Sequence, residues 1–421
     1  MQMTKPSDSS ATLLIRAAWV VPVTGPPLAN GSVLLQAGRI AAVDAYPTML
    51  GQLPLNTKIV DHGDVAILPG LVNAHTHLEL TALAGHITLP QPDFPAWLRQ
   101  LLPLRSTLPL EAVRSGIRDG TRQLHDGGVA VCGDVTLQPP IDASSSTGVS
   151  RHAFIEILGF NVTSLDVALE PAGYPNFIGN SGDIHALSLS AHAPYSTSSK
   201  LIQAVKGWDR DRRLPFSIHV AETREEVQFL QDGTGFFREL LPALGRWVPS
   251  WQAPGMSPVA YLDHLGVLDE LTLLVHTVHL NESDWSTVAE RGCSVCFCPR
   301  SNAQLQVGRP GIETAVELGI PMALGTDSLA SNRDLNVFHE AAYVLDHCPL
   351  VPPQQVLHMA TLGGARALRQ DKNFGSIEPG KRASLLAVQL PLDATSKDLM
   401  ATVIRQGSKG AWRWVETPHL D

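Results

Sequence analysis

The middle of the chain alternates short apolar runs with longer stretches of helical periodicity, for example at 110–128 and 223–233. Eight apolar runs, each bounded by Gly, Pro, Asn or Asp, predict buried strands. In order they are LVNAHTH (71–77), VAVCGDVT (129–136), HAFIEILGF (152–160), IHALSLSAHAPYS (184–196), PFSIHVAE (215–222), LTLLVHTVHL (271–280), CSVCFCPRSN (293–302) and PMALGTDSLASN (321–332). Strands that alternate with helices indicate a parallel sheet, and eight repeats favour a closed (β/α)8 TIM barrel. An open doubly wound sheet would also need a phosphate-binding turn, and the sequence contains neither GxGxxG nor a P-loop.

Both ends of the chain show a different pattern, of short strands punctuated by glycine turns. The strand patterns are TLLIRAAWVVPV, GSVLLQAGRIAAV and TKIVDHGDVAILPG near the N-terminus, and RASLLAVQL and LMATVIRQGSKGAWRWVE near the C-terminus. Strands on both sides of a long middle predict one small β-sandwich domain built from both termini. We therefore expect residues 1–67 and 372–421 to form this domain and residues 68–371 to form the barrel.

Composition and charge narrow the class of protein. With 44% hydrophobic and 17% charged residues in 421, the chain has the composition of a globular enzyme with a large core. A formal net charge of -9 and the lack of any basic run argue against a nucleic-acid partner. The first ten residues are polar, unlike a signal peptide, and no apolar stretch reaches membrane-spanning length. We expect a cytoplasmic protein with no membrane partner.

The five cysteines form an odd set without the pattern of a secreted disulfide framework. Cys293, Cys296 and Cys298 have residue types that could bind a metal as thiolates. However, they lie in the apolar run CSVCFCP, where cysteine packs as a small hydrophobic side chain. We favour the buried strand over a thiolate metal site.

Histidine and acidic residues fall at the carboxyl ends of the predicted strands, the face on which barrel enzymes build their sites. His75 and His77 are two apart at the end of the first strand, so both imidazoles point to the same side. An isolated pair of this kind could equally be two satisfied core histidines. His219 ends the fifth strand and Asp327 follows the eighth, which gives three histidines and an aspartate on one face. This set predicts a site for a divalent metal ion.

The motifs around these residues carry a resemblance to a known family. PGLVNAHTHLE, SAHAPYS, HVAETREE, VHTVHL, CPRSN and GTDSLASN follow one another in this order, and TLGGARAL and GSIEPGKRASLL come after them. The sequence resembles the amidohydrolase superfamily from about Ile67 to Ala387. It is most similar to the branch of deaminases and chlorohydrolases that act on adenosine-type, guanine and s-triazine compounds. Homodimers are common in this branch, so a homodimer is expected from the resemblance alone.

The resemblance implies that His75, His77, His219 and Asp327 bind one divalent ion, with Zn²⁺ expected and Fe²⁺ as the alternative. Relatives with two ions use a carboxylated lysine or a glutamate on the fourth strand. The run at 184–196 contains neither, which favours a single ion. Such an ion lowers the pKa of its water toward about 7 and supplies hydroxide at neutral pH.

Three residues receive catalytic roles from the resemblance. Asp327 would accept the proton of the attacking water, and Glu222 would protonate a ring nitrogen and then pass a proton to the leaving amine. His276 would orient the hydroxide and stabilise developing charge, and whether it also binds the ion stays open. His279, three residues further on, would face the other way in a regular strand.

An alternative interpretation of Glu222 also stays open. Glu225 and Glu226 follow it, so the run could be an acidic helix start favoured by the helix dipole. We assign catalysis to Glu222 and the helix start to the other two.

The segment after the first strand, at 80–104, is too long for an ordinary loop and contains Phe94 and Trp97. Aromatic side chains there suit stacking on a flat heterocycle, although a helix packed on the barrel rim would use the same residues. Family members that deaminate S-adenosylhomocysteine and methylthioadenosine have a glutamate just before a Trp-Leu pair, which is Trp97-Leu98 in this sequence. That glutamate is taken to hold the ribose hydroxyls. Here that position is Ala96. Either Asp93 substitutes or the substrate lacks this contact.

Two further residues are candidates for substrate binding. His192, at the end of the fourth strand, contacts substrate by the resemblance, and a partly buried structural histidine is the alternative. Arg300 could bind a substrate carboxylate bidentately, as in aminodeoxyfutalosine, or form a salt bridge at the barrel rim.

The expected function is hydrolytic deamination of an amino-substituted heterocycle or adenosine-like nucleoside, a small-molecule substrate. Hydrolytic dechlorination or deamination of a triazine-like ring is the nearest alternative. Deamination is favoured because ammonia needs protonation to leave, which Glu222 could supply. A non-catalytic ligand-binding barrel would be missing some of the polar set, and none of it is missing.

Overall fold

A computed structural model describes residues 12–88, 93–137, 148–170, 187–392 and 394–416. The polar residues 1–10, residues 89–92 of the long segment and the predicted strand residues 184–186 lie outside this part. The chain divides into two compact units, one of residues 71–369 and one of residues 1–70 with 370–421.

The unit of residues 71–369 contains the expected barrel. Its eight parallel strands are ordered β6 to β13, and all eight coincide with the predicted apolar runs. They are β6 (Leu71–Thr76), β7 (Val129–Thr136), β8 (Ser150–Ile157), β9 (Leu187–Ala191), β10 (Phe216–Val220), β11 (Thr272–His276), β12 (Ser294–Phe297) and β13 (Met322–Leu324). Nearly every strand residue is buried, as expected for a parallel sheet covered on both faces.

The barrel closes between its first and last strands. Thr76 pairs with Asp327 in parallel, and the Thr326 and Asp327 N–H groups donate to the His75 carbonyl oxygen at 3.0 and 3.1 Å. Gly325 permits this approach, because a Cβ there would lie 2.8 Å from the same oxygen. The closure therefore brings the end of β6 against the segment that follows β13.

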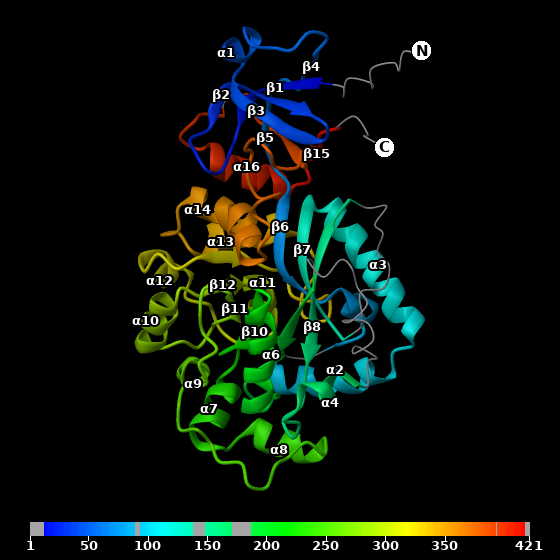
Figure 1. Ribbon diagram of the computed structural model, residues 1–421, viewed down its shortest axis with the longest axis vertical. Helices are drawn as coiled ribbons and strands as arrows, with labels where there is room; N and C mark the ends of the chain where they lie inside the picture. Colours follow the sequence, from blue (N-terminus) through cyan, green and yellow to red (C-terminus); the bar gives the residue numbers. More distant parts are fainter. Residues whose placement is uncertain (1–11, 89–92, 138–147, 171–186, 393, 417–421) are drawn as a thin grey trace, which may run out of the picture. The chain divides into compact units, whose positions relative to one another are not determined.

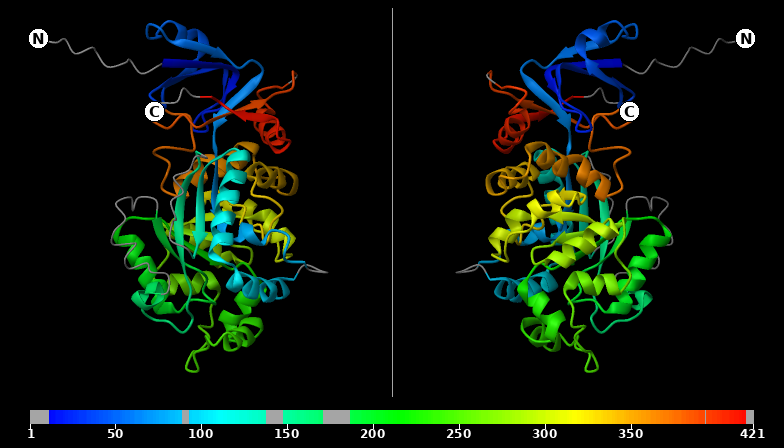
Figure 2. Two further views of the ribbon diagram at one scale, coloured as in Figure 1. Left: turned by 90° about the vertical axis from the view of Figure 1, so that its right-hand side faces the viewer. Right: turned by 90° about the vertical axis from the view of Figure 1, so that its left-hand side faces the viewer.

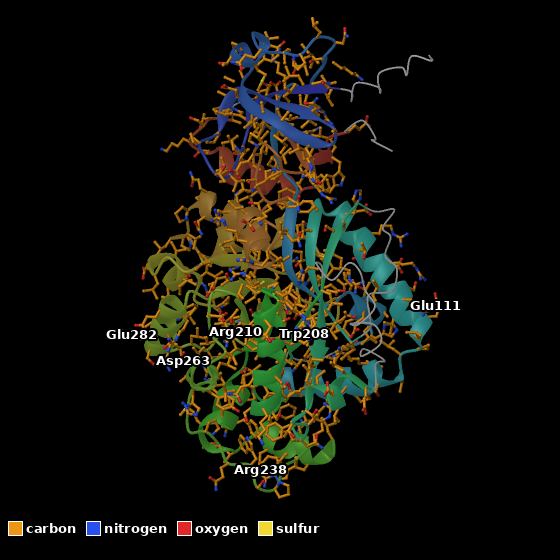
Figure 3. The ribbon with its side chains drawn as sticks, in the orientation of Figure 1. Glu111, Trp208, Arg210, Arg238, Asp263 and Glu282 are labelled. Carbon is orange, nitrogen blue, oxygen red and sulfur yellow. The ribbon has the colours of Figure 1, made fainter. Side chains whose placement is uncertain are left out.

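Helices surround the strands of this unit (Figures 1 and 2). They are α2 (Phe94–Thr107), α3 (Leu110–Asp126), α4 (Leu165–Leu169), α6 (Ser199–Asp211), α7 (Arg224–Asp232), α8 (Phe236–Ala243), α9 (Pro258–His264), α10 (Glu282–Arg291), α11 (Pro299–Gln304), α12 (Ile312–Glu317), α13 (Val337–His347), α14 (Pro353–His358) and α15 (Gly364–Ala367), with a 3₁₀ helix, η1, at Leu78–Leu83 and a π-helix at Met359–Gly363. In α3, Val113, Ile117 and Leu124 recur at helical spacing and are buried, while Glu111 is exposed. Figure 3 shows Glu111 and Glu282 directed away from the barrel.

The second unit is built around a seven-stranded sheet from both ends of the chain. Its strands are β1 (Thr12–Val20), β2 (Leu28–Gln36), β3 (Arg39–Ala45), β4 (Lys58–Asp61), β5 (Val65–Pro69), β14 (Leu385–Gln389) and β15 (Trp412–Trp414), with helix α1 at Tyr46–Leu50. The strands form one connected sheet that branches at β1, which pairs with both β4 and β5 in parallel. Most of the other pairings are antiparallel, including that of β5 with β14 across the two ends of the chain.

One expected strand in this unit is wrong. Most of the run from 399 to 416 is the helix α16 (Leu399–Ser408), and only its end is the strand β15. Leu399, Met400, Val403 and Ile404 are buried, and their spacing of three to four residues places them on one helical face. The apolar content of this run is equally compatible with a strand, and only the spacing of its apolar residues distinguishes the helix.

None of the helices in the described part of the chain combines the length and apolar character needed to cross a membrane.

Candidate active site

The four predicted metal ligands meet at the carboxyl end of the barrel. His75 and His77 lie at the end of β6, His219 lies in β10, and Asp327 follows β13. The Nε2 atoms of His77 and His219 are 3.3 Å apart. Asp327 Oδ1 lies 3.8 Å from His75 Nε2 and 3.7 Å from His77 Nε2. Chain segments separated by about 250 residues thus supply donors to one point.

The chemistry of this donor set fits a divalent cation. Both ring nitrogens of His75 and Nδ1 of His77 are buried, with no hydrogen-bond partner among the described residues. Burial lowers the pKa of His77 to about 4 and that of His219 well below its ordinary value. The imidazoles are therefore neutral at pH 7 and offer lone pairs. Burial opposes the ionisation of Asp327, but the nearby histidines, His75 foremost, hold its pKa well below its usual range.

Hydrogen bonds orient two of these ligands. Asp327 Oδ2 accepts from the hydroxyls of Ser301 at 2.7 Å and Ser331 at 2.6 Å, which leaves Oδ1 to face the histidines. His219 Nδ1 donates to the carbonyl oxygen of His192 at 2.8 Å, so its lone pair is on Nε2. Such bonds from a second layer of residues fix the tautomer and direction of metal ligands.

The backbone is strained where strands end at the site. Ala221, His276, Thr277 and Asp327 have φ values of 50°, 73°, 46° and 56°. Residues other than glycine seldom adopt this left-handed conformation, and each instance costs of order 1–3 kcal/mol. Strain of this kind concentrates at functional sites. Here the left-handed residues turn the chain after β10, β11 and β13, where the polar side chains of the site lie.

Glu222 and His276 lie beside the four ligands. Glu222 Oε1 is 3.6 Å from His276 Nε2. Burial and then the charge of Asp327 raise the pKa of Glu222 well above its usual range, which favours the protonated carboxyl. Burial lowers the pKa of His276 to about 3, and the Asn302 amide donates to His276 Nδ1 at 3.1 Å. This bond leaves the proton of the neutral imidazole on Nε2, directed at Glu222.

Glu226 differs from the expectation of a solvated helix start. Its side chain is buried, and its Oε2 accepts from the Glu222 N–H at 3.1 Å. Burial raises the pKa of Glu226 to about 8. Thr223 caps α7, while Glu225 is only half-buried, as expected for a helix start. Glu226 thus belongs to the buried surroundings of Glu222.

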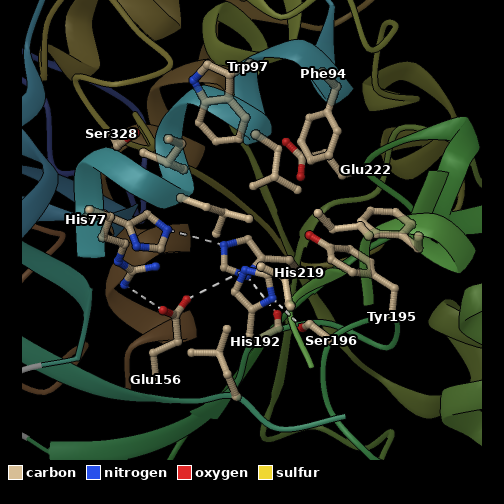
Figure 4. Close-up of a pocket in the computed structure, with 18 of the residues that line it drawn as sticks. His77, Phe94, Trp97, Glu156, His192, Tyr195, Ser196, His219, Glu222 and Ser328 are labelled. Atoms are coloured by element: carbon tan, nitrogen blue, oxygen red, sulfur yellow. Dashed lines mark hydrogen bonds and ion pairs between the residues drawn. The ribbon is translucent and has the colours of Figure 1, made fainter. Parts of the chain in front are cut away.

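A cavity opens above the ligands (Figure 4). Its wall is mostly apolar and its floor polar, with lining residues His77, Leu80, Phe94, Trp97, Leu98, Leu101, Leu102, Arg105, Glu156, Leu158, His192, Tyr195, Ser196, His219, Glu222, Phe237, Leu240, Leu241, Leu244, Arg246, His276, Asp327 and Ser328. Phe94 and Trp97 start helix α2, so the rim helix and the aromatic wall are the same element. The Trp97 indole donates to the Ala330 carbonyl at 2.8 Å, which fixes the ring in the wall.

Some predicted contacts lie elsewhere. Arg300 does not line the cavity; its guanidinium binds both carboxylate oxygens of Asp334 at 2.7 and 2.9 Å and lies 3.5 Å from Glu340. Arg300 therefore forms the salt bridge that was its alternative interpretation, and not a contact in the cavity. Asp93 Oδ2 accepts from the Ala96 N–H at 3.0 Å and caps α2. His279 Nε2 donates to the Val307 carbonyl at 2.7 Å, outside the cavity lining.

His192 does line the cavity, while the cysteines do not. Cys293, Cys296 and Cys298 are buried free thiols, which agrees with the buried-strand interpretation.

Several residues of the cavity were missed from the sequence. Tyr195 stacks on Phe237, with ring centroids 3.8 Å apart. Arg105, Glu156 and Arg246 also line the cavity. Glu156 was detectable, because it follows the apolar run AFI in the third predicted strand, as the other site residues follow theirs. Arg105 comes from helix α2 and Arg246 from the irregular segment after α8, and neither has such a signal.

A (β/α)8 barrel with a buried His/Asp donor set and a carboxyl group at its mouth defines a metal-dependent hydrolase. The chain matches the amidohydrolase family over residues 66–410 and belongs to that family. It is 28% identical to the 5-methylthioadenosine/S-adenosylhomocysteine deaminase of Moorella thermoacetica, over 90% of this chain and 86% of the relative.

Two solved structures are similar over most of the chain. The zinc-bound structure of an adenosine deaminase from Xanthomonas campestris has a TM-score of 0.74 and 26% identity, covering 94% of this chain and 90% of that one. Aminofutalosine deaminase of Helicobacter pylori, in complex with methylthio-coformycin, has a TM-score of 0.81, covering 93% and 96% of the two chains. Its identity is 22%, so it supports the fold alone.

Proposed function

We propose that the protein is a metal-dependent hydrolytic deaminase of an adenosine-like nucleoside, with one divalent ion, Zn²⁺, on His75, His77, His219 and Asp327. The observation that carries this proposal is the convergence of His77, His219, Asp327 and Glu222 on one cavity, with His75 directly beside Asp327. The names of the relatives support the same chemistry, since those reported above are deaminases. The strand β9, LSLSA, has no glutamate or lysine to hold a second ion.

The reaction replaces a ring amino group with oxygen and releases ammonia. The ion would lower the pKa of a bound water toward about 7, so that hydroxide is available for attack on the amino-bearing carbon. Asp327 Oδ1 faces the histidine ligands and is placed to take the proton that the water gives up. Ser301 and Ser331 hold the other oxygen of this carboxylate and keep Oδ1 directed inward.

Glu222 and His276 supply the remaining proton transfers and charge stabilisation. Glu222 would protonate a ring nitrogen of the substrate, which makes the neighbouring carbon more electrophilic, and then carry a proton to the departing amine. His276 would donate from Nε2 to the oxygen on which charge develops. Its Nδ1 accepts from Asn302, so Nε2 keeps the proton without the imidazole being charged.

Dechlorination is the second candidate, and the names of the relatives weigh against it, since those reported above are deaminases. Ammonia leaves only after protonation, whereas chloride leaves as an anion and needs no proton. Burial and then the Asp327 charge raise the pKa of Glu222, which favours a protonated carboxyl that could supply this proton. A ring nitrogen must be protonated in either reaction, so only the proton given to the departing amine distinguishes deamination.

The test couples metal analysis of the purified protein to an ammonia-release screen over adenosine derivatives, other purines, pterins and triazines. We expect about one equivalent of divalent metal and turnover of an adenosine derivative. Absence of any bound or activating divalent metal would overturn the proposal, and chloride release without ammonia release would favour the second candidate.

We further propose that the enzyme acts in the cytoplasm. The five cysteines are all free thiols, as in proteins of a reducing compartment. The homodimer expected from the resemblance stays a prediction, which sedimentation of the purified protein would test.

A further inference from the structure

An arginine and two glutamates form a cluster beside the cavity, and two of them, Arg105 and Glu156, line it. Arg105 Nη2 of α2 donates to Glu79 Oε1 at 2.5 Å and to Glu156 Oε2 at 2.8 Å. The side chain of Glu79 is 5% exposed and that of Glu156 is 0% exposed. One guanidinium thus faces two carboxylates, and both are shielded from solvent.

The two glutamates differ in their second oxygen. Glu79 Oε2 accepts from the Thr136 hydroxyl and from the Leu137 N–H, both at 3.0 Å. Glu156 Oε1 has no hydrogen-bond partner among the described residues, although Glu156 lines the cavity. A buried carboxylate oxygen without a donor is costly, because it has lost its water without replacement. Only one of the two glutamates therefore needs a further partner.

His192 presents a second acceptor at the same place. Its Nδ1 is 2.6 Å from the Ser196 hydroxyl, which itself donates to the Ala193 carbonyl at 3.2 Å. With the Ser196 proton directed at Ala193, His192 donates to Ser196 from Nδ1 and its Nε2 has the lone pair. This Nε2 lies 3.9 Å from Glu156 Oε1, as the dashed line in Figure 4 marks. Two acceptors face each other at a distance too long for a direct hydrogen bond.

We propose that Glu156, oriented by Arg105 and assisted by His192, binds a sugar hydroxyl of the nucleoside substrate. This inference rests on the proposed function. The ring nitrogens of an adenine base are acceptors, and its amino group must lie at the metal ligands to react. The sugar hydroxyls are the remaining donors, and a hydroxyl can donate to Glu156 and accept or donate at His192. Asp93, the other candidate for this contact, is used by the cap of α2.

A cation is the other ligand that could satisfy these acceptors, because Glu156, His192 and His219 are close enough to share one. Two observations disfavour it. The Arg105 guanidinium already lies against Glu156, and His219 uses Nδ1 as a donor and directs Nε2 at His77. A second cation would meet a positive charge and would find no free His219 lone pair on this side.

The test compares Glu156→Gln with the matched variant Glu79→Gln on the best nucleoside substrate and its 2′- and 3′-deoxy forms. In E156Q the amide oxygen would face Arg105 and the NH₂ group would face His192, so the free acceptor becomes a donor. Glu79→Gln disturbs the same guanidinium but leaves the cavity acceptor in place.

We expect E156Q to lower kcat/KM on the hydroxylated nucleoside by about 10- to 100-fold, mainly through KM, as befits a hydrogen bond to a charged group. On the deoxy form that lacks the bound hydroxyl the loss should be under about threefold. E79Q should lower both rates by the same factor and keep the wild-type preference for the hydroxyl.

Each other outcome has a definite meaning. Equal loss on all substrates in E156Q, in a wild-type enzyme that deaminates nucleosides, would overturn this inference and leave the proposed function intact. No wild-type deamination of any nucleoside would overturn both. If the wild type binds two equivalents of metal and E156Q binds one, the ligand of Glu156 is a second cation and not a sugar hydroxyl.

Discussion

Asn302 controls which nitrogen of His276 holds the proton, and this makes it a sensitive test of the mechanism. Both side chains are buried, and the amide donates to His276 Nδ1 at 3.1 Å. Asn302→Asp changes this donor to an acceptor with almost no change in volume. The neutral imidazole would then have its proton on Nδ1 and a lone pair on Nε2, the reverse of the native state.

The magnitude follows from the loss of one preorganised donor. His276 Nε2 would no longer donate to the oxygen that gains charge, and removing one such donor lowers kcat about 10²- to 10³-fold, or ~2.7–4 kcal/mol. Asn302→Leu leaves neither tautomer favoured, so its kcat should lie between those of the wild type and N302D. Because the four proposed metal ligands are untouched, metal content should not change.

The assay is steady-state kinetics on the best substrate with metal analysis of each variant. N302D should also regain activity toward acid pH, because a carboxylate beside His276 raises the pKa of the imidazole, and the imidazolium again donates from Nε2. Wild-type kcat in N302D would refute this reasoning. It would mean that the amide oxygen faces His276 in the native enzyme, with Nε2 free to bind the metal ion as a fifth ligand.

Three other predictions concern separate parts of the barrel. His219→Ala should lose bound metal, whereas Glu222→Gln should keep the metal and lose about 10²- to 10⁴-fold in kcat; full activity in E222Q would refute the proton-transfer role. Arg300→Ala should lower the free energy of unfolding in urea by about 3 kcal/mol, because Glu340 is left buried without its cation, yet should not change the preference for carboxylate-bearing substrates. A selective loss on those substrates would refute the structural role. Burial lowers the pKa of His152 to about 4, against about 6.5 in the unfolded chain, so its contribution to stability is present above pH 6.5 and is lost as pH falls through 4. Between pH 7 and pH 5 the loss of unfolding free energy in urea should therefore be about 2 kcal/mol smaller in His152→Leu than in the wild type, and an equal loss in the variant would contradict this.

The fold was predictable because the barrel strands are buried on both faces. Each strand then reads as a short continuous apolar run, and its polar end marks the face of the site. The error at α16 has the same origin. Leu399, Met400, Val403 and Ile404 are also a mainly apolar run, and only their spacing separates a helix from a strand.

The site was predictable where residues follow strands and not where they come from helices. His75, His219 and Asp327 are fixed by the barrel, since parallel strands end at one face. Arg300 also follows a strand, but the sequence does not reveal that Asp334 lies close enough to bind it. Arg105 reaches the cavity only because α2 packs across the barrel mouth, a tertiary arrangement with no local signal.

Burial is the main cause of the two opposite protonation states that the proposed chemistry needs. Removal of water disfavours charge on any group, so it lowers the pKa of His77 and His276 and raises that of Glu222. The histidines are thereby neutral, as ligands and hydrogen-bond donors, while the glutamate stays protonated, as an acid. The pKa of Asp327 is lowered instead, because the histidines around its carboxylate, His75 foremost, outweigh the effect of burial. Two serine hydroxyls also donate to this carboxylate. The apolar wall of the cavity, by excluding water, is therefore as much a part of the catalytic apparatus as the polar floor.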